Sequence, residues 1–392
     1  MTRKQWIPIA GIAAAAVLVT GGIAVAAVHP WSGDDGPAGT AAEQPSSTAT
    51  SGTAEDAGRS AATLRSDFID DYVQGGRVVR TDQGGDTVSE GQAYGMLIAL
   101  ASDDRSTFSD IWTWTRKHLQ GDDHLLAWRW QVDGGTADEQ SASDADLDAA
   151  RALVLAGKRF DEPSYTRAGT QIAGAILAKE TVMTDVGRIL LPGPWAKTGD
   201  PYKYDASYAS PVAYSLLFAA TGDDRWKELE TGSRAVAENI LAKTDLPSDW
   251  AQVHQDGSVD PLASPSGDSG PVVYGWDAMR MPLRFAESCS ADDRTIAGSI
   301  APTLRRSTQL AAQLDLGGTA VTDSTSALAY AARAASEQAS GSTSAATKDL
   351  ARADRTAATT PTYYGDAWAA LGATMLTSDA LGGCAADGGS AS

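Results

Sequence analysis

Three short segments of this 392-residue chain combine carboxylates with apolar or aromatic neighbours. The first is SEGQAYGMLIAL, where Glu90 stands near the start of a helical stretch of small and apolar residues. In the simplest interpretation Glu90 caps the helix N-terminus, where the helix dipole favours an acid. A carboxyl in such apolar surroundings also has a raised pKa and can protonate a departing oxygen. Glu90 is therefore a candidate general acid.

The second segment, SASDADLDAARALVLAGKRF, places Asp144, Asp146 and Asp148 at alternate positions where a helical run begins. Alternate carboxylates occur in calcium-binding loops, but the central glycine and the closing glutamate of an EF-hand are missing here. A capping cluster at a helix N-terminus is the structural alternative. The segment is thus either a helix cap or one wall of a site.

The third segment is VVYGWDAMRMPLRF, where Asp277 follows Trp276 and precedes Arg280 by one helical turn. An acid and a base in apolar surroundings can simply form a buried ion pair. If both acids act in one reaction, Glu90 must be protonated while Asp277 is ionised. An apolar niche for Glu90 and Arg280 beside Asp277 would push the two pKa values in opposite directions.

The elements that carry these acids have the spacing of amphipathic helices. From Ala61 onward, stretches such as FSDIWTWTRKHL and ADLDAARALVLAGKRF have apolar residues at i, i+3, i+4 and i+7. Strand signals are weak, and Gly, Pro and Asp clusters separate the stretches. A single all-α domain with on the order of a dozen helices fits this pattern. Antiparallel helix pairs repeated around a ring would bring their loops to one mouth, where we expect the site.

The order of these motifs resembles glycoside hydrolase family 8, a family of endoglucanases and chitosanases. The resemblance covers about residues 61–381 and includes GGRVV, SEGQAYGM, AWRW, SASDADLDAARALVLAGK, LLPGPW, DASYASP, YGWDAMRMPLR and YYGDAWAALG. It implies an (α/α)6 barrel with a substrate groove across its mouth. It also implies hydrolysis with inversion at the anomeric carbon.

The resemblance assigns roles to the three acids. Glu90 matches the family's proton donor, and Asp277 matches the aspartate that activates water as general base. Asp144 matches a residue described as a nucleophile or as the group that holds the distorted sugar; since inversion needs no covalent nucleophile, we favour the second role. Inversion also predicts that the Glu90 and Asp277 carboxyls lie about 6.5–9.5 Å apart. If instead Asp144 lies opposite Glu90 and Asp277 is buried against Arg280, the base role passes to Asp144.

Aromatic residues in the matched motifs are candidate sugar contacts, because sugar faces present C–H groups that pack on flat rings. We predict substrate-binding roles for Trp128, Trp130, Trp195 and Tyr208, and for Arg280 among the polar residues. The structural alternative is core packing. For Trp130 the two interpretations have equal weight.

The composition excludes several classes of function. The chain has 50 acidic and 31 basic residues, a formal net charge of -19, and no basic cluster beyond short pairs. A nucleic-acid partner would demand Lys and Arg along one face, so we expect none. The four His and two Cys have no spacing typical of a zinc or haem site, so we predict no metal and no cofactor. We expect a monomer whose partner is its saccharide substrate.

The first residues predict export. Arg3 and Lys4 precede an uncharged apolar stretch from Ile7 to Val28, and this positive flank is expected to stay in the cytoplasm. The stretch is long enough to span a bilayer, whereas small residues near Ala26 resemble a cleavage site. We expect a protein that is either anchored on the outer face of the cytoplasmic membrane or secreted.

Export would expose Cys289 and Cys384 to an oxidising compartment, but the sequence leaves open whether they pair.

Composition divides the chain into four parts. We predict a signal peptide or signal anchor in residues 1–29, a disordered Ser/Thr/Gly/Ala-rich tether in 30–60, the catalytic domain in 61–383 and a disordered tail in 384–392.

These inferences lead to a predicted activity. We expect inverting endo-hydrolysis of β-1,4 bonds in an extracellular glucan, either cellulose-like or of mixed linkage. One alternative is a chitosanase or xylanase on the same scaffold. Another is a tethered glycan-binding protein without catalysis, which the presence of both Glu90 and Asp277 disfavours.

Overall fold

The computed structural model describes residues 58–132, 135–267 and 269–384. The predicted export segment lies outside these residues, as do nearly all of the predicted tether and tail. Within the described part of the chain, no helix has the length and apolar character needed to cross a bilayer. The predicted catalytic domain, residues 61–383, lies within the described part of the chain except for residues 133, 134 and 268.

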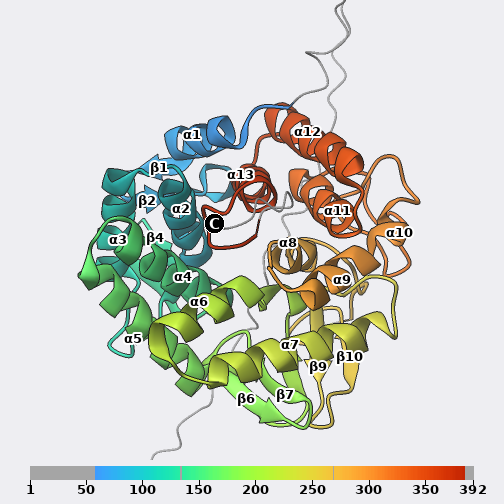
Figure 1. Ribbon diagram of the computed structural model, residues 1–392, viewed down its shortest axis with the longest axis horizontal. Coiled ribbons are helices and arrows are strands. Elements are labelled where there is room, and N and C mark those ends of the chain that lie inside the picture. The colour runs from blue at the N-terminus through green and yellow to red at the C-terminus, as the bar shows by residue number, and fades with distance from the viewer. Residues whose placement is uncertain (1–57, 133–134, 268, 385–392) are drawn as a thin grey trace, which may run out of the picture.

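The helices form two concentric rings (Figure 1). Each inner helix contacts the next inner helix along the chain, and α13 contacts α2, which closes the ring. The predicted all-α (α/α)6 barrel is confirmed. The inner ring consists of α2 (Ser89–Ala101), α4 (Ser143–Arg159), α6 (Pro211–Thr221), α8 (Arg280–Ala286), α11 (Ala327–Ala339) and α13 (Tyr363–Thr377). The outer ring consists of α1 (Ala61–Tyr72), α3 (Arg105–His118), α5 (Pro163–Lys179), α7 (Arg225–Leu241), α9 (Ala291–Ser299) with the short α10 (Ala301–Leu304), and α12 (Thr343–Thr359).

The burial of each helix follows its sequence pattern. In the outer helix α3, the buried residues are Phe108, Ile111, Trp112 and Thr115, which is one stripe at helical spacing. The inner helix α2 is apolar or small all round, and every residue except Glu90 is buried. Helix α2 is therefore enclosed by its neighbours, and Glu90 is where it meets the solvent.

The two ends of the barrel differ in the length of their loops. Inner helices lead to outer helices through short connections such as 102–104 and 160–162. Outer helices lead to the next inner helix through long connections such as 119–142, 180–210 and 242–279. Because inner and outer helices alternate along the chain, the long connections gather at the N-terminal ends of the inner helices. This end is the mouth at which the site was predicted.

Short antiparallel strands occupy several of these long connections. They are too brief to show a two-residue period clearly, so the sequence patterns did not reveal them. Among the described residues, two sheets have three strands, in the orders β3-β4-β5 and β10-β9-β8, and two are hairpins. The strands are β1 (Val73–Gln74), β2 (Arg77–Val78), β3 (Thr87–Val88), β4 (Ala127–Gln131), β5 (Gly135–Ser141), β6 (Thr181–Thr184), β7 (Gly187–Leu190), β8 (Tyr202–Tyr204), β9 (Trp250–Val253) and β10 (Val259–Leu262).

Three ion pairs join α4 to α8, two inner helices that are separated in the ring by α6. All six side chains are less than 5% exposed. The pairs are Asp144 with Arg280, Asp148 with Arg284, and Arg151 with Glu287. In the first two pairs α4 contributes the acid, whereas in the third pair α4 contributes the arginine. We call them the α4–α8 ion pairs.

A disulfide joins Cys289 to Cys384, with an S–S distance of 2.01 Å. The backbone amide of Cys384 also donates a hydrogen bond to the carbonyl of Glu287, at 2.9 Å. The disulfide links the segment that follows α8 to the segment that follows α13. The pairing that the sequence left open is therefore present in the structure.

Candidate active site

The predicted acids lie at the N-terminal ends of inner helices. Glu90 is the second residue of α2 and Asp144 the second residue of α4, while Arg280 begins α8 and Asp277 precedes it by three residues. Tyr208 ends a short 3-10 turn immediately before α6. Helix N-termini carry partial positive charge, which acts to lower the pKa of acids placed there.

Arg280 is the centre of the site. Its Nη1 donates to Asp144 Oδ2 at 2.5 Å, and its Nη2 donates to Asp277 Oδ1 at 2.9 Å. The same Nη2 lies 3.8 Å from Asp205 Oδ2, and Nη1 lies 3.3 Å from the hydroxyl of Tyr94. The structure thus brings together Asp144, Asp277 and Arg280, as the sequence predicted, and adds Asp205.

The two principal carboxylates differ in exposure. The side chain of Asp144 is 2% exposed, whereas that of Asp277 is 23% exposed. Both are bound to Arg280, so burial against this arginine does not single out Asp277 as structural. Asp277 is the acid that solvent can reach, and it is therefore the better candidate for activating a water. Its predicted distance from Glu90 stays a prediction.

The carboxyl of Glu90 keeps its proton to a higher pH than an ordinary glutamate does. Burial raises its pKa to about 7, and the charge on Asp144 contributes, while Arg80 and Arg280 act in the opposite direction. The hydroxyl of Ser89 lies 3.3 Å from Glu90 Oε2. The direction agrees with the prediction, and it is the one that a general acid requires.

The pKa of Asp277 differs from the prediction. We expected Arg280 to lower it, but burial raises it by more than the arginine lowers it. The charge on Asp144 adds to this rise. Burial and the charge on Asp277 also raise the pKa of Asp205 well above its usual range. The site therefore retains protons that a separate ion pair would release.

Aromatic rings extend from this cluster. The guanidinium of Arg280 lies 5.2 Å from the ring centre of Tyr208. Tyr208 is 6.4 Å from Trp250, which is in turn 6.4 Å from Trp195. These rings form a row from the carboxylates towards a surface pocket.

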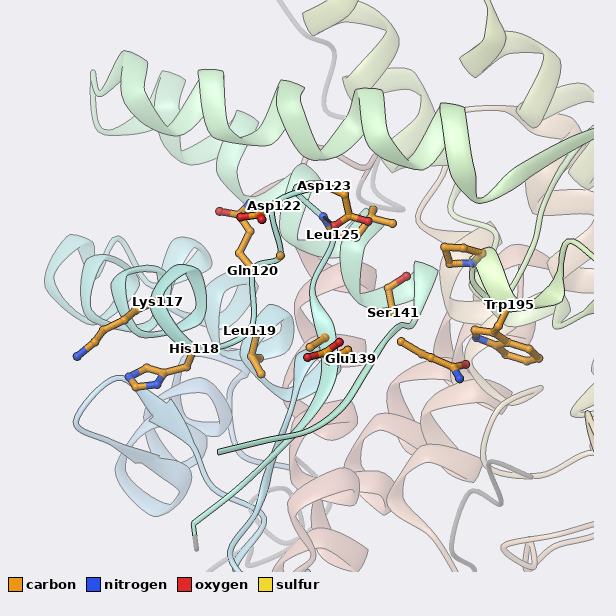
Figure 2. A pocket seen from close by; sticks show the side chains of 14 residues that line it. Lys117, His118, Leu119, Gln120, Asp122, Asp123, Leu125, Glu139, Ser141 and Trp195 are labelled. Carbon is orange, nitrogen blue, oxygen red and sulfur yellow. Dashed lines mark hydrogen bonds between the residues drawn. The ribbon is translucent and has the colours of Figure 1, made fainter. Parts of the chain in front are cut away.

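The pocket has a volume of about 690 Å³. Figure 2 shows Trp195 at one end of it, Lys117 and His118 at the other, and Glu139 and Ser141 between them. The lining is mostly polar, with one large aromatic face, which suits a saccharide better than an apolar ligand.

Comparison with known proteins identifies the family. Residues 53–377 match the family model described as glycosyl hydrolases family 8. The chain belongs to glycosyl hydrolase family 8. This finding confirms the predicted family and places the chain among the glycoside hydrolases.

Curated relatives and solved structures agree with this family 8 membership. The chain is 35% identical over 215 residues to a probable endoglucanase of Novacetimonas hansenii, covering 54% of this chain and 62% of that protein. It is 31% identical over 213 residues to an endoglucanase of Cellulomonas uda, covering 53% and 58%. The alignments thus span less than two thirds of these relatives.

Solved structures match over a larger share. The endo-beta-1,4-glucanase CMCax from Acetobacter xylinum is 27% identical, with a TM-score of 0.67, and the match covers 81% of this chain and 97% of that chain. An endoglucanase from Komagataeibacter sucrofermentans is 26% identical, with a TM-score of 0.63, and the match covers 76% and 98%. The barrel is therefore shared along nearly the whole length of these enzymes.

Two acids of this family 8 site were missed from the sequence. Asp205 Oδ1 accepts hydrogen bonds from the amide and the hydroxyl of Ser207, at 2.8 and 2.7 Å, which holds the turn that carries Tyr208. Asp249 accepts from two backbone amides beside Asp277. Both acids stand shortly before an aromatic residue, in DASY and SDW. This local pattern does not reveal their role, which depends on contacts formed only in the folded chain.

The alternating acids of α4 turn to different partners. Asp148 forms a two-bond pair with Arg284, one bond being 2.6 Å long. Asp146 Oδ1 accepts from the amide of Leu126 at 2.8 Å, and its carboxyl lies beside that of Glu180. Asp144 alone turns to the Arg280 cluster. The three acids therefore do not converge on one cation, as a calcium loop would require.

The two tryptophans of AWRW have different surroundings. Trp130 packs edge-on against Trp114 at 5.4 Å, and the guanidinium of Arg77 lies 4.5 Å from its ring centre. This cluster favours the packing role for Trp130. Irregular pairing of β4 with β5 on either side of Arg129 breaks the alternation that would put both rings on one face. Trp128 stays a candidate sugar contact.

Proposed function

We propose that this family 8 protein hydrolyses β-1,4-glycosidic bonds within a glucan chain, with inversion at the anomeric carbon. The observation that carries the proposal is the arrangement of Glu90, whose pKa is raised to about 7 by burial and by the nearby charge of Asp144, with two carboxylates bound to Arg280. An inverting glycosidase needs one carboxyl that donates a proton and another that accepts one.

In this mechanism Glu90 donates its proton to the glycosidic oxygen as the bond to the anomeric carbon breaks. Asp277 accepts a proton from a water that attacks the opposite face of the sugar. The net result is the addition of one water across the bond. The 23% exposure of Asp277 supports its role, because the base must contact a water that enters from the groove.

Asp144 acts without transferring a proton. It is 2% exposed and held by Arg280 at 2.5 Å, so its position is fixed. A fixed carboxylate there stabilises the positive charge that develops on the sugar ring in the transition state. Arg280 orients Asp144 and Asp277 together, and it is a positioning residue rather than a direct sugar ligand.

A β-1,4-glucan is the proposed substrate. The relatives described above are named endoglucanases or endo-beta-1,4-glucanases. Trp195, the partly exposed end of the row whose other members Tyr208 and Trp250 are buried, provides a face for a sugar. We propose cellulose-like or mixed-linkage glucan rather than chitosan or xylan. The basic and apolar N-terminal residues support export to the outer face of the cytoplasmic membrane or beyond.

A reducing-sugar assay on carboxymethylcellulose, lichenan, chitosan and xylan tests the proposal. We expect release from the two glucans, with the α-anomer appearing first in the NMR spectrum of the products. Retained configuration would contradict the inverting mechanism, and release from chitosan or xylan alone would contradict the substrate class.

A matched pair of variants tests the acid. Glu90→Gln keeps the shape of the side chain but cannot donate a proton, so turnover should fall by at least about 100-fold. Glu238→Gln is the control, because Glu238 is exposed on the outer helix α7. Activity of Glu90→Gln within a few-fold of the control would remove Glu90 from the chemistry.

A further inference from the structure

The segment that carries Asp277 is held by a carboxylate from a distant part of the chain. Asp249 Oδ1 accepts hydrogen bonds from the amides of Gly275 and Ala278, at 2.7 and 2.9 Å. The amide of Asp249 donates to the carbonyl of Val273 at 2.8 Å. Asp249 is 9% exposed and lies next to β9. Its two acceptor contacts bracket Asp277 on both sides.

These contacts replace a local helix cap. The residues from Gly275 to Met279 form a turn that leads into α8, with Met279 N bonded to the Gly275 carbonyl at 3.1 Å. The residue before α8, Met279, makes no side-chain capping bond. Amides at the start of a helical turn have no partner within the turn itself, so they need an external acceptor. Asp249 supplies that acceptor for two of them.

The chain is shaped to admit this carboxylate. A Cβ atom added to Gly275 would lie 2.7 Å from Asp249 Oδ2 and 3.3 Å from Gln313 Cγ. The first distance is shorter than van der Waals contact allows. Glycine at this position therefore permits the close approach of Asp249 to the turn.

Two other contacts hold the same segment from other directions. Tyr274 and Leu314 exchange backbone hydrogen bonds, both 2.9 Å long. The hydroxyl of Tyr364, on α13, donates to the carbonyl of Trp276 at 2.7 Å. Asp249 differs from both because its two hydrogen bonds lie on either side of Asp277 in the chain. They fix the backbone of the turn and thereby the orientation of the Asp277 side chain.

The Asp249 carboxyl also interacts electrostatically with the base. Burial raises the pKa of Asp249 to about 7, and the charge on Asp277 contributes to the rise. An uncharged side chain that keeps a carbonyl oxygen in the Oδ1 position could therefore make the same two bonds. Asparagine is such a side chain, and leucine has the same size without an acceptor.

We propose that Asp249 is a positioning residue for the general base, holding the Gly275–Met279 turn so that Asp277 meets the attacking water at the reactive distance. This inference rests on the proposed function of the site. A shift of about 1 Å in a reacting group can cost on the order of 100-fold in rate. Substrate binding by Trp195 should not depend on Asp249.

The test compares kcat and KM of the full-length protein and its Asp249→Asn and Asp249→Leu variants on carboxymethylcellulose. Asp249→Leu should lower kcat by about 10- to 100-fold with KM little changed, as expected for a displaced reacting group. Asp249→Asn should stay within a few-fold of the wild type. Asp315→Leu is the control, because Asp315 Oδ1 also accepts two amides, at 3.0 and 2.7 Å, in an exposed turn.

An aryl cellooligosaccharide with a good leaving group separates the base from the acid. Glu90→Gln should regain activity on it, because that substrate needs no proton donor, whereas Asp249→Leu should stay impaired. If Asp249→Leu does not fold, judged by its thermal unfolding, Gly275→Ala serves instead. It displaces the Asp249 carboxylate by steric contact and should also lower kcat without raising KM.

Unchanged kcat in Asp249→Leu or Gly275→Ala would overturn the inference, and so would equal losses in the Asn and Leu variants. If the wild type and Asp315→Leu are active and Asp277→Asn is not, such a result refutes only the role of Asp249. A wild type that cleaves no β-glucan refutes the proposed function and this inference together.

Discussion

Asp144 and Asp277 are bound to the two terminal nitrogens of one guanidinium, at 2.5 and 2.9 Å from Arg280 Nη1 and Nη2. A single cation thus sets both the orientation and the charge of two carboxylates that the proposed mechanism uses differently. Removing Arg280 alone would leave Asp144 and Asp277 without their ionic partner in a buried site. This costs more stability than replacing all three charged side chains by apolar ones.

Arg280→Met should therefore shift the pH profile as well as lower activity. Arg280 lowers the pKa of Asp277 and of Glu90, so its loss should raise both values. The base would then ionise at higher pH and the acid would lose its proton at higher pH. Both limbs of the kcat/KM profile should move upward. Arg306→Met, which removes an exposed pair with Asp245, should leave the limbs in place.

The alkaline limb of the wild type should reflect Glu90. With a pKa of about 7, Glu90 is protonated below this pH and loses its proton above it. The kcat/KM value for a natural glucan should accordingly fall tenfold for each pH step of about 1 above the limb. Steady-state kinetics between pH 4 and 9 would show it. A profile that stays flat to pH 9 would be inconsistent with Glu90 as the acid.

Stability should fall at alkaline pH because of a buried pair of carboxyls. Asp146 and Glu180 are fully buried, and burial raises the pKa of Glu180 to about 8 and that of Asp146 well above its usual range. The stability that comes from a raised pKa is fully present below the unfolded value, about 4, and is lost as pH rises through the folded value.

Glu180→Gln tests this pair, because an amide can donate to Asp146 at any pH. Its free energy of unfolding should exceed that of the wild type at pH 9, by on the order of a few kcal/mol, and be similar at pH 5. Denaturant unfolding at both values gives the comparison. Glu162→Gln, at the exposed start of α5, should show no such change, and a wild type equally stable at pH 5 and 9 would refute the prediction.

Reduction of the Cys289–Cys384 bond should lower stability without lowering turnover. The two cysteines are 95 positions apart in sequence, and closing a loop of this size restricts the unfolded chain by about 5 kcal/mol in the chain-entropy model. Cys289→Ser should lower the midpoint of thermal unfolding, and a reductant should do the same to the wild type only. Unchanged midpoints in both experiments would show that the bond does not form in solution.

The parts of the structure that could be predicted are those written in local patterns. The stripe on α3 and the uniformly apolar α2 follow directly from residue spacing, and Glu90 stands out because it interrupts an apolar helix. Asp249 could not be found in this way, because its partners lie 26 and 29 positions away. The pKa of Asp277 was predicted wrongly because no local pattern shows how far the folded chain buries this carboxyl or that Asp144 lies near it.

The reversed polarity of the third α4–α8 ion pair restricts how these two helices can slide along each other. If α4 moved by one turn in one direction, Asp148 would face Arg280, but Arg151 would face Arg284 and two cations would meet. If it moved in the other direction, Asp148 would face Glu287 and two anions would meet. Three pairs of uniform polarity would tolerate either displacement. The order of charges therefore specifies a single axial alignment of α4 against α8. This alignment also fixes the position of Asp144 relative to Arg280 at the N-terminal ends of the two helices.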